Sequence, residues 1–275
     1  MTVYAQINYA QTNLQLYQQL ARADYPQTDI LAIHRAYEIA IQQFSGQYRS
    51  SGKTFIAHLM GVSSILVWLE QPVQIIIAGM IHSIYQHGDF GAVIQPMNYA
   101  ISQRKRESVA QLFGAYIEEL AYRYTHLDPN AKTFQDYFDR HDSLSPIAQE
   151  LLLIRLADLL EDTLDDGLLF CPNWQARQRH IQDIATIAVD LAHQLGYSNF
   201  AIALEESFRK ILETKPVPMM QNSMTDNASF LLVPSYYRKT LPAILKEKST
   251  HWARSLMVIY KKVSWRLNQV LSCSL

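Results

Sequence analysis

The chain has 275 residues, of which 49% are hydrophobic and 18% charged, so it can bury a substantial core and is neither disordered nor fibrous in composition. Its formal net charge is −1, but the charge is unevenly distributed: from Pro216 onward there are 8 Lys/Arg and 2 Asp/Glu, against 16 and 23 before it. Two cysteines, Cys171 and Cys273, offer neither a disulfide framework nor a zinc-binding spacing.

The N-terminal sequence lacks the basic and apolar regions of a signal peptide. No segment approaches the roughly 18 consecutive apolar residues of a membrane-spanning helix. Together with the small number of cysteines, these features predict a cytoplasmic protein.

Helical periodicity dominates the first 214 residues. Glycine is rare, with 9 in the chain, and apolar residues recur at spacings of three and four, which predicts an all-α fold. We expect helices near residues 3–22, 28–45, 55–70, 73–86, 106–124, 146–164, 174–195 and 199–213. Thr28 or Asp29 would cap the second helix and Asn199 the eighth, because short polar side chains accept hydrogen bonds from free backbone N–H groups there.

The sequence changes character near residue 215. Prolines and small polar residues predict a linker or surface loop over 215–239. Residues 240–275 then resemble a basic amphipathic helix, since the apolar positions 245, 252, 256, 259, 263, 267 and 270 fall on one stripe and Lys248, Lys261, Lys262 and Arg266 lie off it.

The predicted tail has several possible targets. It would pack on the acidic part of its own chain, on a second copy as a homo-oligomer, or on a partner protein. A basic face with tryptophan also fits peripheral membrane binding, whereas nucleic acid is the least supported target because no recognised binding motif accompanies the basic face.

Three polar residues occupy positions that the periodicity assigns to the core: His58, His82 and Asp158. Asp162 follows Asp158 by one turn on the same helix face. A buried carboxylate needs a cation or strong hydrogen-bond donors, so the three residues predict either a hydrogen-bonded polar cluster or a metal site.

The stretch RSSGKTFIAH follows the pattern Arg-x-Ser-Gly-x-x-aromatic-Ile-x-His, through Arg49, Ser51, Gly52, Phe55, Ile56 and His58. AGMIHS, the Phe113-Gly114 pair and LIRLADLLEDT come after it in the chain. In this order, over about residues 28–165, the motifs resemble those of the HD-domain hydrolases, in particular the RelA/SpoT-type alarmone hydrolases. The resemblance implies an HD-like helical bundle over residues 1–214.

The resemblance also implies roles for individual residues. His58, His82 and Asp158 match metal ligands of the family, and Arg49 matches a basic residue of the nucleotide pocket. Ser51 and Ser83 complete the expected substrate-binding set with Arg49.

The sequence departs from the family at the centre of its motif. Ser83 replaces the aspartate of the His-Asp pair, and Gln86 and His87 stand where the family has an acidic pair. Asp162 replaces an asparagine. These differences argue against alarmone hydrolysis itself and against a binuclear site.

Two imidazoles and one carboxylate suit a single divalent ion, either zinc or manganese for hydrolysis or the iron of a non-haem oxygenase. Glu161 or Asp162 would serve as the base toward water, with His87 as a displaced acid–base group. The plainer interpretation of the segment around His87 is a helix C-terminus with Gly88 in the left-handed conformation.

Two functional hypotheses follow. In the first, the protein is a mononuclear metal-dependent enzyme, similar to phosphohydrolases, that acts on a nucleotide or another phosphorylated or polar small molecule. In the second, the fold has lost its metal and serves as a scaffold or regulatory binding module.

Overall fold

The computed structural model describes residues 9–90, 101–171 and 173–215. The chain divides into two units, Met1–Leu232 and Val233–Leu275, and the second lies outside the described residues. The predicted amphipathic helix and all but the first residue of the predicted linker also lie outside them.

The prediction of an all-α fold is confirmed. In the described ranges the backbone forms helices, turns and one isolated bridge between Tyr48 and Thr54, with no strand. The helices are α1 (Asn13–Arg22), α2 (Gln27–Phe44), α3 (Phe55–Trp68), α4 (Val73–Ile81), α5 (Ile84–His87), α6 (Gln103–Phe113), α7 (Ala115–His126), α8 (Ala131–Asp139), α9 (Pro146–Thr163), α10 (Trp174–Gln194) and α11 (Ser198–Glu213), with short 3₁₀ segments at His141–Ser143 and Leu164–Phe170.

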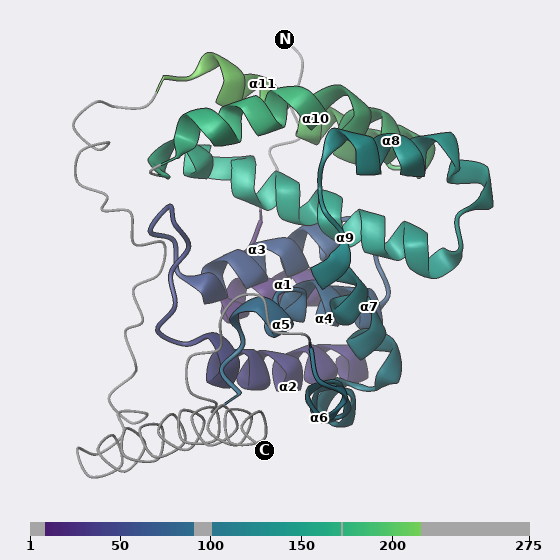
Figure 1. Cartoon of the computed structure of the whole chain (residues 1–275). Coiled ribbons are helices and arrows are strands. Elements are labelled where there is room, and N and C mark those ends of the chain that lie inside the picture. Colours follow the sequence, from purple (N-terminus) through teal and green to yellow (C-terminus); the bar gives the residue numbers. More distant parts are fainter. Residues whose placement is uncertain (1–8, 91–100, 172, 216–275) are drawn as a thin grey trace, which may run out of the picture. The chain divides into compact units, whose positions relative to one another are not determined.

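Helix α9 is the central element of the bundle. It lies between α10 and α11 on one side and α3, α4 and α7 on the other (Figure 1). A helix covered on all sides is apolar over most of its circumference, and α9 is buried without interruption from Leu151 to Glu161. Helix α3 is likewise buried from His58 to Val67. These two helices carry His58 and Asp158, so both side chains project from the least exposed part of the fold.

Several predicted helix ends are wrong because local hydrogen bonds move them. Helix α1 begins at Asn13 rather than near residue 3, since Thr12 forms a capping box with Gln15, and residues 9–12 are not helical. Thr28 and Asp29 lie inside the first turn of α2, whose N-cap is Pro26.

Asn199 likewise lies inside α11, whose N-cap is Tyr197. The N-caps of α2 and α11 make no side-chain hydrogen bond. The residues expected to cap these helices lie two or three positions after the observed N-caps.

The helix predicted over 106–124 is two helices. Gly114 has φ +91° and separates α6 from α7, and this backbone conformation is readily adopted by glycine alone. The helix predicted over 73–86 also breaks, at His82 and Ser83.

Helix α8 is not among the helices that the periodicity predicts. This helix is short and largely polar, and it buries one large side chain, Phe134. Asn130 caps it by accepting a hydrogen bond from the amide of Thr133 at 2.8 Å. Among the described residues, no helix is both long and apolar enough to cross a membrane.

The central position of α9 predicts a steep dependence of stability on its core side chains. Leu156 is 0% exposed, and we expect Leu156→Ala to lower the free energy of unfolding by about 2–5 kcal/mol, because the cavity cannot collapse between packed helices. Leu14 is 68% exposed, and Leu14→Ala should change the free energy of unfolding by about 0.5 kcal/mol or less. Urea denaturation of both variants measures the difference, and equal effects would contradict the assigned core.

Candidate metal centre

A tight backbone hairpin positions Arg49 at the start of the site. Tyr48 pairs with Thr54, and the amide of Arg49 donates to the carbonyl of Lys53 at 2.8 Å. Gly52 closes the turn with φ +86°, a conformation that favours glycine. Thr54 then caps α3, so the hairpin leads directly into the helix that bears His58.

His82 lies where α4 ends, with its side chain almost fully buried. Its Nδ1 donates to the carbonyl oxygen of Gly79 at 2.7 Å. Burial is the main cause that lowers the pKa of His82 to about 3, so the ring is neutral and carries its proton on Nδ1. The lone pair on Nε2 is therefore available for another partner.

His58 is completely buried and is oriented by a carboxylate. Its Nδ1 bonds to Glu161, whose second oxygen accepts from Lys53. Burial and the charge of Arg49 oppose protonation of His58, but Glu161 and Asp158 outweigh them and raise its pKa to about 9. Because Glu161 keeps one proton on Nδ1, the second proton that the raised pKa favours lies on Nε2, and a metal ion at Nε2 would have to replace it.

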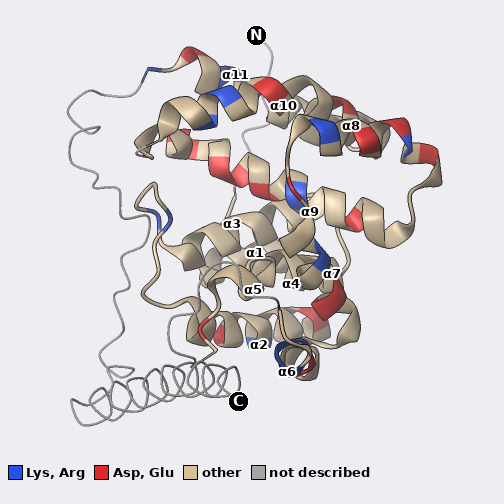
Figure 2. Cartoon of the chain, viewed as in Figure 1, with Lys and Arg blue, Asp and Glu red and all other residues tan. Residues whose placement is uncertain are grey.

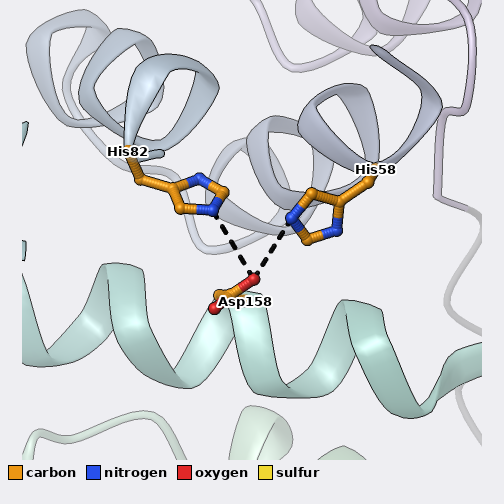
Figure 3. Close-up of side chains that lie close together, drawn as sticks. All are labelled: His58, His82 and Asp158. Atoms are coloured by element: carbon orange, nitrogen blue, oxygen red, sulfur yellow. Dashed lines mark ion pairs between the residues drawn. The ribbon is translucent and has the colours of Figure 1, made fainter. Parts of the chain in front are cut away.

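Asp158 faces both imidazoles. Its Oδ2 accepts hydrogen bonds from the Tyr124 hydroxyl and from Arg155 Nη1, the latter at 3.1 Å. Its Oδ1 lies 3.3 Å from His58 Nε2 and 3.6 Å from His82 Nε2 (Figure 3). Burial opposes ionisation, but the histidines and Arg155 hold the pKa of Asp158 well below its usual range, so the group is a carboxylate.

The donor set fits a single divalent ion. The nearest ligand atoms of His58, His82 and Asp158 all lie within 4.8 Å of one another. Asp158 Oδ1 is buried and has no hydrogen-bond partner among the described residues, although a buried polar atom normally has one. In each histidine the other ring nitrogen bonds to an oxygen, the arrangement that orients histidine ligands in metalloproteins. The three residues predicted as ligands therefore converge.

A second set of charged groups lies at the same end of α9. Both oxygens of Asp162 accept hydrogen bonds from Arg49 Nη2, and the two side chains are each 21% exposed. Figure 2 shows the acidic residues in the C-terminal half of α9 facing the basic hairpin that precedes α3. The three carboxylates outweigh burial and raise the pKa of Arg49, so its positive charge is stabilised in place.

The remaining predicted residues are not among the groups whose ligand atoms converge. Ser51 is half-buried in the hairpin turn, and Ser83 is buried at the N-cap of α5. His87 is exposed and its ring lies 4.7 Å from that of Phe55, which also contacts His58.

The left-handed backbone conformation expected for Gly88 is wrong. Its φ is −67°, and a side chain there would collide with the Ile84 carbonyl.

Three residues of the site were not predicted from the sequence. Tyr124 and Arg155 hold Asp158, and Lys53 holds Glu161. Arg155 could have been inferred, because it precedes Asp158 by three positions on one helix face. Tyr124 comes from a separate helix, and no spacing in the sequence links it to Asp158.

Comparisons with known proteins support the resemblance that the motifs indicate. A family described as "Domain of unknown function (DUF6817)" matches residues 41–129. The bifunctional (p)ppGpp synthase/hydrolase SpoT of Escherichia coli is 28% identical over 193 residues, which covers 68% of this chain and 25% of that protein. A probable GTP pyrophosphokinase of Mycobacterium leprae is 24% identical over 200 residues, covering 70% of this chain and 22% of the relative.

Another relative matches a shorter stretch of the chain at a higher identity. The bifunctional (p)ppGpp synthase/hydrolase RelA of Mycobacterium tuberculosis is 36% identical over 61 residues, or 22% of this chain. The chain spans about a quarter of the length of the relatives from Escherichia coli and Mycobacterium leprae. The comparisons thus connect the chain to RelA/SpoT-type proteins as a distant relative.

Gly61 provides a test of how Glu161 is held. A Cβ atom at Gly61 would lie 2.6 Å from Glu161 Cγ and 2.7 Å from its Oε1. We expect Gly61→Ala to push Glu161 away from His58 and to lower the free energy of unfolding by about 1–3 kcal/mol, despite the better helix propensity of alanine.

The sign of this effect should reverse when Glu161 is shortened. In a Glu161→Ala background there is no clash, so Gly61→Ala should stabilise α3 by up to about 1 kcal/mol. Urea denaturation of the four proteins in this double-mutant cycle gives the coupling, and additive effects would show that Gly61 does not make room for Glu161.

Proposed function

We propose that this protein is a metal-dependent hydrolase with a single divalent ion, acting on a nucleotide or another phosphorylated small molecule. The observation that carries the proposal is the convergence of three potential ligand atoms, His58 Nε2, His82 Nε2 and Asp158 Oδ1, in a buried place. Names of the relatives support the reaction class, since several are called pyrophosphohydrolases. Manganese, zinc and iron all suit two imidazoles and one carboxylate.

A divalent ion held there would polarise a phosphoryl oxygen and make a water molecule more acidic. The protein groups supply binding and orientation. Arg49 is the basic side chain suited to phosphate oxygens, because its planar guanidinium makes paired hydrogen bonds and is partly exposed. Ser51 belongs to the same hairpin and would add a hydroxyl to this substrate-binding surface.

Among the residues proposed as base, Asp162 is better placed than Glu161. Glu161 is 1% exposed and both its oxygens are occupied, by His58 and Lys53, so its role is to orient His58. Asp162 is partly exposed and would exchange its contact with Arg49 for one with water. His87 is exposed beside Phe55 and is the remaining acid–base candidate.

Ser83 supports one metal ion rather than two. By the resemblance of the sequence motifs it corresponds to the aspartate of the His-Asp pair, and a serine hydroxyl cannot supply the negative charge that bridges two cations. We therefore do not propose alarmone hydrolysis as the reaction. An iron-dependent oxygenase uses the same three ligand types and would differ by requiring oxygen.

A scaffold or regulatory binding module is the second candidate. The observation in its favour is that Asp158, Glu161 and Asp162 each have a cationic side chain as partner, so the cluster is compensated without any metal ion. Such a module would retain its function when the histidines are replaced.

Metal binding and its dependence on His82 separate the two candidates. We expect the purified protein, made without a histidine tag, to bind about one equivalent of Mn²⁺ or Zn²⁺. His82→Ala should weaken binding by at least about a hundredfold, more than the loss of an outer hydrogen-bond partner causes, and should abolish hydrolysis of phosphate esters.

The matched control is His126→Ala, which removes an exposed histidine outside the cluster and should leave metal binding unchanged. Isothermal titration calorimetry measures the affinity, and thermal unfolding confirms that both variants are folded. Absence of metal binding in the unsubstituted protein would contradict the enzyme hypothesis and favour the scaffold. Turnover that requires oxygen would instead favour the oxygenase.

A further inference from the structure

The carboxylates of the metal centre are paired with cations of the protein itself. Asp158 pairs with Arg155, Glu161 with Lys53 and Asp162 with Arg49. Arg155 and Lys53 approach carboxylate oxygens that face away from the convergence point. Arg49 differs from both, because it also reaches a nitrogen that the metal ion needs.

Arg49 Nη1 lies 3.1 Å from His58 Nε2. In the singly protonated ring, whose proton the contact with Glu161 places on Nδ1, Nε2 accepts a hydrogen bond from Arg49. A metal ion would bind the same lone pair at about 2.1 Å. One lone pair cannot serve both partners, and two positive charges at this separation repel each other. The guanidinium and the metal ion are therefore alternative occupants of His58 Nε2.

Asp162 holds the guanidinium in this position. It accepts two hydrogen bonds from Nη2 while Nη1 points to His58, so the planar group is fixed from two sides. Both side chains are partly exposed, which leaves Arg49 a route away from the site. Asp162 stands one helical turn after Asp158, close enough to influence the metal position without being one of its three ligands.

We propose that Arg49 is an internal cation that a divalent metal ion must displace from His58, and that Asp162 acts as a positioning residue which favours the metal-free arrangement. The inference rests on the metal site of the proposed function. In this proposal Asp162 weakens metal binding, whereas an ordinary acidic neighbour would strengthen it by attracting the metal ion.

A phosphate-type anion assists the displacement. Arg49 loses two partners when it moves, and a phosphate group bound near the metal ion offers the guanidinium a replacement with paired oxygens. Metal and anion therefore bind cooperatively, and by thermodynamic linkage each strengthens the other by the same factor.

The decisive experiment measures Mn²⁺ affinity for the full chain and for Asp162→Asn, with and without about 1 mM inorganic phosphate, by calorimetry or by electron paramagnetic resonance of free Mn²⁺. Asparagine keeps the shape of aspartate but cannot hold the guanidinium by a charged pair. We expect Asp162→Asn to bind Mn²⁺ about tenfold more tightly than the unsubstituted chain without phosphate, and phosphate to tighten binding about tenfold in the unsubstituted chain but much less in the variant.

Asp165→Asn is the control, since it removes an equal charge from a carboxylate bonded to Tyr9 and Gln11 rather than to Arg49. It should leave Mn²⁺ affinity unchanged or slightly weaker. Arg49→Gln should bind Mn²⁺ more tightly and lose the effect of phosphate.

The sign of the change in Asp162→Asn decides the proposal. Weaker or unchanged Mn²⁺ binding in that variant, while the unsubstituted chain binds, would overturn the displacement of Arg49 and leave the proposed enzyme intact. No Mn²⁺ binding by any of the four proteins would overturn both.

Discussion

The presence of three carboxylates on one helix, two of them buried and one partly exposed, is the constraint on which the site depends. Asp158, Glu161 and Asp162 lie in the C-terminal half of α9, in the centre of an apolar bundle. An isolated carboxylate in such a place is strongly unfavourable, so each needs a charged partner with good geometry. The bundle supplies these partners from the hairpin before α3 and from α9 itself.

Hydrogen-bond partners in the same cluster fix the proton on Nδ1 of each histidine. Glu161 is fixed by Lys53 and in turn fixes the proton of His58 on Nδ1, whereas the end of α4 provides a backbone carbonyl for His82. Tyr124 and Arg155 occupy one oxygen of Asp158 and leave the other facing the two rings. The three potential ligand atoms are therefore held close to one place. This arrangement is a property of the whole bundle, because the groups come from four helices and a hairpin.

Periodicity was sufficient to find the helices that matter and the polar residues inside them. His58, His82 and Asp158 stand out because each interrupts an apolar pattern, and the structure brings their ligand atoms together. Partners such as Tyr124 were not predictable, since Tyr124 is far from Asp158 in the sequence and tyrosine is common in cores. The predicted ends of helices were wrong for a different reason. A helix cap depends on which hydrogen bonds form locally, and a glycine such as Gly114 can also be accommodated inside a helix at a modest cost.

The charge balance of the cluster bears on the ligand proposed for it. Three carboxylates already face three protein cations, so a divalent ion bound there would enter a cluster with no excess negative charge among the described residues. In a buried place an uncompensated double charge is costly, and an anionic group on the ligand is the simplest compensation. Ser83 is uncharged and adds nothing to this balance. The proposed metal ion would therefore depend on the bound molecule for part of its electrostatic stabilisation, which favours phosphorylated ligands over neutral ones.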